Sequence, residues 1–199
     1  MRWLQKNFKV IAIAESFKLE DGFAVYAGVL ARRDGLVEKA AYELATLGGT
    51  DGTEKALRIA RALNRPDVHM VMLGGCIVSY YNWIDGETIW RELGLPTACY
   101  LFEKPEGDVR AALEKLFPDW RERWENISRL GPSVEFAYPD GPKVYVRSWG
   151  LDPRDAYRAA LLSRRYGKIP EPLRIAKTIA EAARVFLEKY RGKTTPVIL

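Results

Sequence analysis

The run from Val10 to Phe17, Val-Ile-Ala-Ile-Ala-Glu-Ser-Phe, constrains the fold of this chain more than any other stretch. Its first five residues are apolar, and one acid and one hydroxyl follow them. A short apolar run of this kind is typical of a strand that is buried on both faces, as the central strands of α/β sheets are. Because functional groups in such sheets gather where the strands end, Ala14, Glu15 and Ser16 are expected to border a site.

The residues after this strand predict an antiparallel meander and then a return to the first strand. Residues 22–33 and 36–47 both show alternating apolar patterns, and Asp34-Gly35 between them is a strong hairpin signal. Residues 53–64 then show helical spacing. A second short apolar run, Val68–Leu73, is expected to lie parallel to the first strand.

The rest of the chain continues to mix helices and strands. Helices are expected over residues 85–93, 107–116 and 118–130 and after Asp152 and Pro170, and strands over residues 97–102, 134–138 and 143–148. The expected inner stripe of the last helix is Ala176, Ile179, Ala183, Phe186, Leu187 and Tyr190. No repeat or linker divides the chain, so its 199 residues predict a single α/β domain with a mixed sheet, flanking helices and a loose tail over residues 193–199.

Composition excludes several classes of site. One histidine, His69, and two cysteines, Cys76 and Cys99, rule out a histidine-rich metal site, a zinc quartet and a disulfide framework, and Cys76 is expected to be a buried structural thiol. No apolar run approaches the roughly 20 residues that span a bilayer, and the N-terminus lacks a signal-peptide pattern, so a cytoplasmic protein is expected. The single glutamine and the many charged residues are typical of a thermophilic source.

Positively charged and aromatic residues could bind a nucleic acid. The net charge is +5, and residues 151–199 hold eleven Lys or Arg against five Asp or Glu. A phosphate-rich partner would account for this excess, although a solvated helix face is the simpler explanation. Tyr80, Tyr81 and Trp83 could stack on an unpaired base or, as easily, cover the core.

Acidic residues are sparse at the expected site. Metal-dependent phosphoryl chemistry needs two or more carboxylates that converge on a hard cation. The first strand ends in Glu15, but the second ends in Gly74-Gly75; Asp51 and Glu54 could reach the same edge. These acids make a poor metal cage, and the chain has no dinucleotide or Walker-type glycine motif, so no cofactor is expected.

Several motifs resemble the endonuclease dU family, archaeal relatives of endonuclease V within the ribonuclease H-like fold. They are Pro-Glu-Pro-Leu-Arg at residues 170–174, Asp-Gly-Thr-Glu at 51–54, Tyr-Asn-Trp-Ile-Asp at 81–85 and Gly-Leu-Pro at 94–96. The resemblance covers residues 10–191. It implies a ribonuclease H-like, endonuclease V-like fold and an endonuclease that uses Mg²⁺ or Mn²⁺ on deoxyuridine- or deoxyinosine-type lesions in DNA.

The chain departs from this family where the metal is expected. The leading acid of the first strand corresponds to Ala14, an Asp-Gly pair corresponds to Gly74-Gly75, and a His or Asp of the last helix corresponds to Lys177. Glu15 could turn toward the position of its neighbour, but alternation along a strand points its side chain to the opposite face. The resemblance therefore implies a nucleic-acid-binding relative whose DNA-repair-type hydrolysis is lost or much weakened.

Two other interpretations remain open. One is an active endonuclease that uses Glu15, Asp51 and Glu54 in a shifted acidic site with Mg²⁺ or Mn²⁺. The other is a non-catalytic protein-interaction subunit. For the leading interpretation, the residues expected to contact a nucleic acid are Tyr80, Asn82, Arg147, Arg174 and Lys177.

Overall fold

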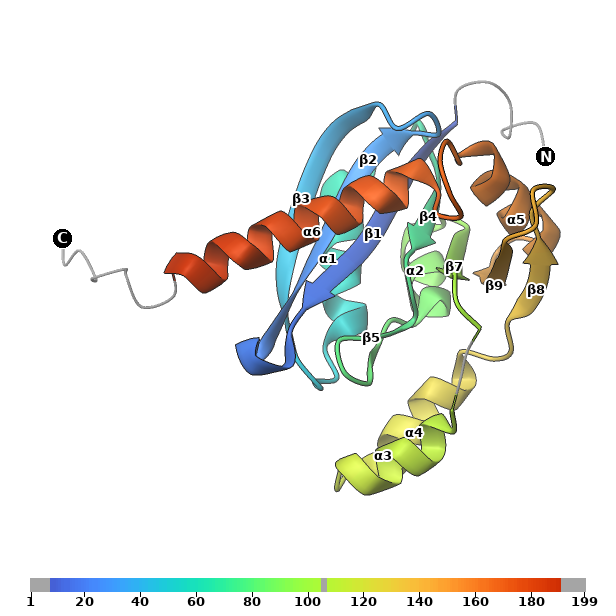
Figure 1. Cartoon of the computed structure of the whole chain (residues 1–199). Coiled ribbons are helices and arrows are strands. Elements are labelled where there is room, and N and C mark those ends of the chain that lie inside the picture. The colour runs from blue at the N-terminus through green and yellow to red at the C-terminus, as the bar shows by residue number, and fades with distance from the viewer. Residues whose placement is uncertain (1–7, 105–106, 191–199) are drawn as a thin grey trace.

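The computed structural model describes residues 8–104 and 107–190 and forms a mixed sheet of seven strands with helices on both faces (Figure 1). The sheet strands are β1 (Lys9–Phe17), β2 (Phe23–Arg32), β3 (Val37–Thr46), β4 (Val68–Leu73), β7 (Thr97–Leu101), β8 (Val134–Ala137) and β9 (Lys143–Trp149). The helices are α1 (Gly52–Leu63), α2 (Gly86–Leu93), α3 (Val109–Leu116), α4 (Trp120–Arg129), α5 (Pro153–Leu162) and α6 (Glu171–Tyr190), with the short 3-10 helix η2 (Leu19–Asp21). The predicted α/β class and N-terminal meander are confirmed.

The order of strands in the sheet is β3-β2-β1-β4-β7-β9-β8, so β1 is an interior strand, third of the seven and next to the middle strand β4. β1 pairs antiparallel with β2 and parallel with β4, and β4 pairs parallel with β7. The expected hairpin turn joins β2 to β3. There Gly35 has a φ of 89°, a backbone conformation that favours glycine, and its N–H donates to the Arg32 carbonyl over 2.9 Å. The pairing of β1 with β4 confirms the parallel arrangement that the sequence predicts for these two strands.

β1 is buried on both faces, as its apolar sequence predicts. Ile11 and Ile13 belong to the core under α1 and α2, whereas Ala12 and Ala14 belong to the core under α5 and α6. On β2, a side chain at Gly28 would overlap with Ile59 of α1, so glycine permits a close approach of this helix to the sheet. Two packed layers thus hold the carboxyl end of β1 rigidly in place.

The inner stripe predicted for α6 is wrong over the second half of the helix, where other residues than the predicted ones face the sheet. Ala176, Ala180 and Arg184 are buried, whereas Phe186 is 60% exposed and Tyr190 is 43% exposed. The helix runs on past the edge of the sheet, so its last turns have no apolar layer to cover (Figure 1). The predicted tail over residues 193–199 lies outside the described residues.

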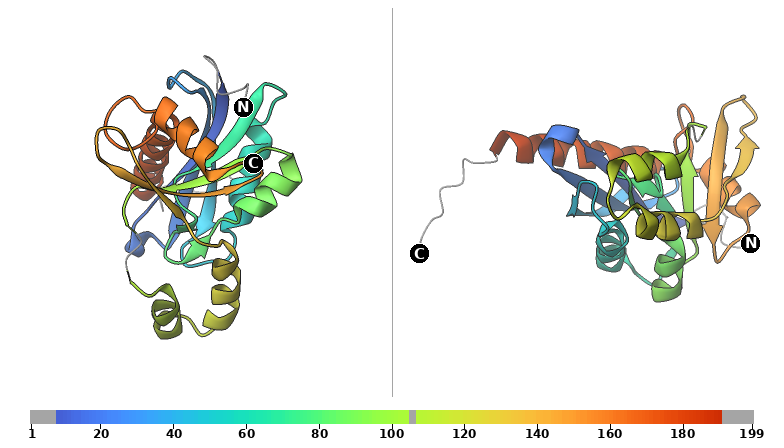
Figure 2. Two further views of the ribbon diagram at one scale, coloured as in Figure 1. Left: turned by 90° about the vertical axis from the view of Figure 1, so that its right-hand side faces the viewer. Right: turned by 90° about the horizontal axis from the view of Figure 1, so that it is seen from below.

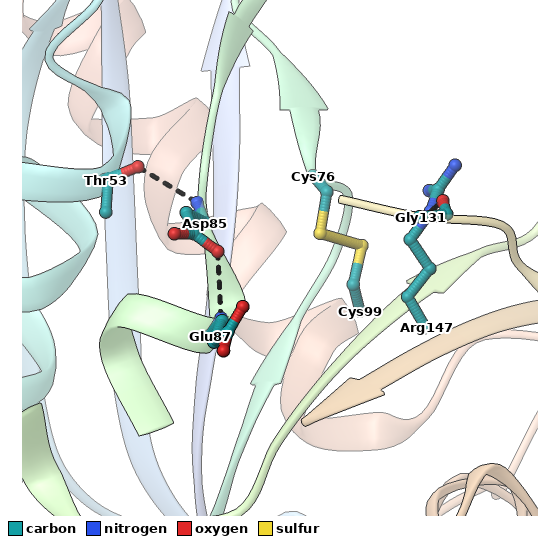
Figure 3. Close-up of a disulfide and its surroundings, with 7 residues drawn as sticks. All are labelled: Thr53, Cys76, Asp85, Glu87, Cys99, Gly131 and Arg147. Carbon is teal, nitrogen blue, oxygen red and sulfur yellow. Dashed lines mark hydrogen bonds between the residues drawn. A yellow bond between two sulfur atoms is a disulfide. The ribbon is translucent and has the colours of Figure 1, made fainter. Parts of the chain in front are cut away.

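The two cysteines form a disulfide, contrary to the expectation of a free buried thiol at Cys76. Cys76 follows β4, Cys99 lies in the adjacent strand β7, and their Cα atoms are 6.1 Å apart (Figure 3). The sequence hides this pairing, because it depends on the parallel neighbours β4 and β7 bringing the two positions together. Both cysteines are fully buried.

Two features of the fold lie outside the main sheet. The strands β5 (Ile77–Val78) and β6 (Asn82–Trp83) form a small hairpin that the sequence did not predict. The helices α3 and α4 form a second hairpin, which projects from the body of the molecule (Figure 2). Across the described ranges, no helix is long and apolar enough to cross a membrane.

Candidate functional site

The carboxyl ends of β1 and β4 border a pocket on the face of the sheet that α6 covers. Its volume is about 200 Å³. The lining residues are Ala14, Glu15, Gly74, Phe102, Ile169, Leu173 and Lys177. The N–H of Gly74 donates to the carbonyl of Ile13 over 2.9 Å, so the two strand ends lie side by side. This is the edge where the sequence predicts a site.

Lys177 supplies the charge in this pocket. The buried Leu173 and Ala176 anchor this part of α6 to the sheet, and Lys177 lies on the exposed side of the same turn. Its ammonium group donates a hydrogen bond of 2.7 Å to the backbone oxygen of Glu15. At the neighbouring strand ends, Ala14 contributes only a methyl group and Gly74 has no side chain. The pocket is therefore apolar with one cationic corner.

The carboxylate of Glu15 lies on the other face of the sheet, as strand alternation predicts. It accepts a hydrogen bond from the Ser79 hydroxyl, which lies 3.2 Å from the hydroxyl of Tyr26. Burial raises the pKa of Glu15 above its ordinary value of 4.5, and burial also raises the pKa of Tyr26. Glu15 thus belongs to a buried polar network behind the pocket.

The turn that carries Ser79 has an unusual backbone. Ser79, Tyr80 and Tyr81 have φ values of 43°, 60° and 65°, in the left-handed region that residues other than glycine rarely adopt. The carbonyl of Ser79 accepts from the N–H of Gly48, and its hydroxyl bonds to Glu15. These bonds fix the turn, so the hairpin β5–β6 is fastened to the end of β1.

Asn82 links this hairpin to Asp51. Its side-chain oxygen accepts from the N–H of Gly52 over 2.9 Å and from the N–H of Trp83 over 2.8 Å. Its amide nitrogen donates to the Thr46 carbonyl and, over 2.8 Å, to the Asp51 carboxylate. Asn82 is fully buried and its amide has no free capacity, so it stabilises the hairpin and is out of reach of a nucleic acid.

The motif Asp51-Gly-Thr-Glu54 has a structural explanation. Asp51 precedes α1, but its carboxylate turns back to accept from the N–H and the hydroxyl of Thr46, and it makes no side-chain cap bond to the helix. A side chain at Gly52 would overlap with the Trp83 carbonyl. Glu54 forms an exposed pair with Arg58 in the next turn of the helix.

The acids Glu15, Asp51 and Glu54 therefore do not converge on one point. Within residues 8–104 and 107–190, no group of three or more His, Cys, Asp or Glu side chains is placed to hold a metal ion. At the strand ends themselves, an apolar wall and an ammonium group occupy the positions that would surround a divalent cation. Because Mg²⁺ and Mn²⁺ require oxygen ligands, the residues present do not fit such an ion.

The other residues expected to contact a nucleic acid have varied surroundings. Tyr80 is half-buried, and its ring lies 5.8 Å from that of Phe117 between centroids. Arg174 is paired with Glu171 one turn earlier in α6. Arg147 lies on β9 and lines a different pocket from the one at Ala14 and Gly74.

Sequence reasoning missed several residues around the strand end. Tyr26 and Ser79 were not singled out, although Tyr26 lies directly across from Glu15 in the β1–β2 pairing. Knowing the register of β1 and β2 would have identified Tyr26 as the neighbour of Glu15. The sequence does not give this register, because no two-residue turn signal lies between the two strands. Arg184 lies outside the inner stripe predicted for α6, yet it is buried and paired with Asp21 over 3.0 Å.

Comparisons with sequence relatives identify the family. A family model described as endonuclease dU matches residues 6–184. A UPF0215 protein from Pyrobaculum calidifontis is 57% identical over 179 residues, which cover 90% of this chain and 98% of that protein. A UPF0215 protein from Thermococcus gammatolerans is 34% identical over 168 residues, which cover 84% and 85% of the two chains.

Comparisons with solved structures identify the fold. A protein of unknown function from Archaeoglobus fulgidus superposes with a TM-score of 0.76 at 24% identity, covering 88% of this chain and 98% of that one. Human endonuclease V gives a TM-score of 0.64 at 14% identity, covering 94% and 91%. Endonuclease V from Ciona intestinalis, in complex with DNA containing an inosine followed by a ribo-adenosine, gives 0.59 at 12% identity, covering 92% and 87%. The chain has the fold of endonuclease V, and it belongs to the endonuclease dU family.

Proposed function

We propose that this protein binds nucleic acid at the carboxyl ends of β1 and β4 and lacks the metal-dependent hydrolysis that its family name describes. One observation carries the proposal: Ala14 and Gly74 line the strand ends, and the ammonium group of Lys177 lies beside them. The site has a cation of its own where metal chemistry would need carboxylates.

The nucleic-acid half of the proposal is supported by the pocket and by the fold. An exposed ammonium group attracts phosphate, and the apolar walls from Phe102 and Leu173 suit the ring of an unpaired base. The Ciona protein with this fold is in complex with DNA. The substrate that we consider first is therefore DNA with a deoxyuridine or deoxyinosine lesion.

The proposed loss of hydrolysis is supported by the positions of the carboxylates that could bind a metal ion. Two-metal or one-metal phosphoryl transfer depends on carboxylates that hold the cation and orient the attacking water. The Glu15 carboxylate lies on the other face against Ser79, and Asp51 is engaged by Thr46 and Asn82. Forming a shifted metal site from these acids would require breaking the hydrogen bonds of Glu15 with Ser79 and of Asp51 with Thr46 and Asn82.

The test combines binding and cleavage. Fluorescence anisotropy with labelled single-stranded and double-stranded DNA, with and without one deoxyuridine or deoxyinosine, is measured over a salt series. We expect affinity to fall steeply with salt, and Lys177→Met to reduce the slope of log K against log salt by about one. Lys143→Met is the matched control, because Lys143 lies on β9 in an exposed pair with Glu135.

The same oligonucleotides are then incubated with Mg²⁺ or Mn²⁺. No cleavage is expected at protein concentrations that saturate the DNA. Cleavage that Asp51→Ala abolishes would instead establish an active endonuclease with a shifted acidic site. Absence of salt-dependent DNA binding would reject the proposal in favour of a protein-interaction subunit.

A further inference from the structure

A larger pocket lies on the other face of the sheet, between β9 and the α3–α4 hairpin. Its volume is about 650 Å³, within the range of small-molecule sites in proteins. Ile77, Val109, Trp124, Ile127 and Arg147 are among the residues that line it. The pocket thus combines residues from β5, α3, α4 and β9, and it shares no lining residue with the Ala14–Gly74 pocket.

Arg147 is the cation of this pocket. Its Nε donates a hydrogen bond of 2.7 Å to the Gly131 carbonyl, which fixes the plane of the guanidinium group (Figure 3). In the part of the chain that the structure describes, no carboxylate pairs with it. The acid in the pocket lining, Asp108, caps α3 by accepting from the N–H of Ala111 over 3.1 Å.

Burial makes this isolated charge significant. The side chain of Arg147 is half-buried, and burial lowers the pKa of the guanidinium group from its ordinary value. A desolvated cation without an anion is unfavourable, and a ligand that supplies one would stabilise it. The two terminal nitrogens of a guanidinium group match the oxygens of a phosphate or a carboxylate in a bidentate arrangement.

The remaining lining suits a planar apolar body. Trp124 contributes an indole ring, and Ile77, Val109 and Ile127 contribute aliphatic surface. Aromatic and aliphatic side chains bind a nucleobase by stacking and burial with little dependence on which base it is. An oxyanion attached to a planar ring is therefore the ligand chemistry that this pocket complements.

We infer that the Arg147–Trp124 pocket binds a nucleotide, with its phosphate on Arg147 and its base against Trp124. Gly74 of the Ala14–Gly74 pocket directly follows β4, and Ile77 of this pocket begins β5 three residues later, so both pockets border the segment that joins β4 to β5. The nucleotide is either a free nucleoside monophosphate or one unit of a strand, and only the second source rests on the proposed function.

Isothermal titration of the full chain with dAMP tests the inference. We expect saturable binding of dAMP, and at least tenfold weaker binding of deoxyadenosine and of inorganic phosphate, because each lacks half of the contacts. Arg147→Gln should weaken dAMP binding at least tenfold, while Lys143→Met on the same strand should leave it unchanged. A short strand with a 5′-phosphate, compared with the same strand without one, distinguishes the two sources of nucleotide.

A second variant keeps the test decisive if Arg147→Gln does not fold, as judged by circular dichroism and thermal unfolding. Val109→Trp enlarges a side chain that lines the pocket without removing the guanidinium group, and it should also abolish dAMP binding. No saturable binding of dAMP by the natural protein, or equal binding by a folded Arg147→Gln protein, would overturn the inference. Lys177→Met should not affect dAMP, so this outcome is separable from failure of DNA binding at the other pocket.

Discussion

The ammonium group of Lys177 lies 2.7 Å from the backbone oxygen of Glu15, near the end of the buried strand β1. This contact joins α6 to β1 at the position where the endonuclease dU resemblance leads one to expect a metal ion. A fixed positive charge at this position opposes a second cation by direct repulsion. The chemistry of the site therefore depends on the residues at three positions, Ala14, Gly74 and Lys177.

Restoring acids at the strand ends should restore metal binding. A side chain at Gly74 would meet ordinary van der Waals contacts, the nearest being 3.5 Å from Ala14, so Asp is sterically allowed there. We expect the triple variant Ala14→Asp, Gly74→Asp, Lys177→Met to bind Mn²⁺ in calorimetry and to gain thermal stability from the ion. The isosteric control with Asn at both strand positions should do neither. Equal Mn²⁺ affinity of both variants would show that the strand ends do not form the site.

The buried pair of Arg184 and Asp21 should be a major source of stability. Their side chains are 7% and 5% exposed, and Arg184 also contacts Ser16 and Glu188. Arg184→Met leaves a carboxylate buried without its cation, which costs about 3–5 kcal/mol. Urea unfolding measures this loss. Glu188→Ala, which removes a partly exposed partner, should cost at most about 1 kcal/mol, and equal losses for both variants would contradict the assignment.

Glu15 should make the protein less stable as the pH rises. Burial raises the pKa of Glu15, so the folded protein holds this proton more tightly than the unfolded chain does. That contribution is fully present below pH 4.5 and is lost as the pH rises through the folded pKa. Glu15→Gln mimics the protonated group and should unfold at higher urea than the natural protein at pH 8, with a smaller difference at pH 4. Glu54→Gln is the exposed control, and the same trend in that variant would remove Glu15 as the cause.

The Cys76–Cys99 disulfide should increase the free energy of unfolding of the protein. It closes a loop with a sequence separation of 23, for which the chain-entropy account gives about 3 kcal/mol. The urea midpoint should therefore fall in the presence of a reductant that reaches the buried sulfurs after partial unfolding. A variant with Ser at both positions should already have the lower midpoint and should not respond to reductant. An identical response of both proteins would mean that the bond does not contribute.

Local patterns predicted the framework of this protein because they depend on neighbours in the chain. The apolar run of β1, the turn at Asp34-Gly35 and the strand Val68–Leu73 all express alternation or turn chemistry over a few residues. The placement of Glu15 opposite Ala14 follows from the same alternation. The prediction failed for Phe186 because the end of the sheet, which decides where the inner stripe of α6 stops, is not visible in a helical pattern.

The sequence by itself determined the α/β class, the N-terminal meander, the burial of β1 on both faces and the absence of an acid at Ala14 and Gly74. Only the tertiary structure decided which distant residues meet: Cys76 with Cys99, Arg184 with Asp21, Lys177 with Glu15, and Arg147 with the pocket beside Trp124. The reason is physical. Strand and helix patterns arise within one element, whereas pockets and buried charge pairs arise from register and crossing geometry between elements that no local pattern encodes.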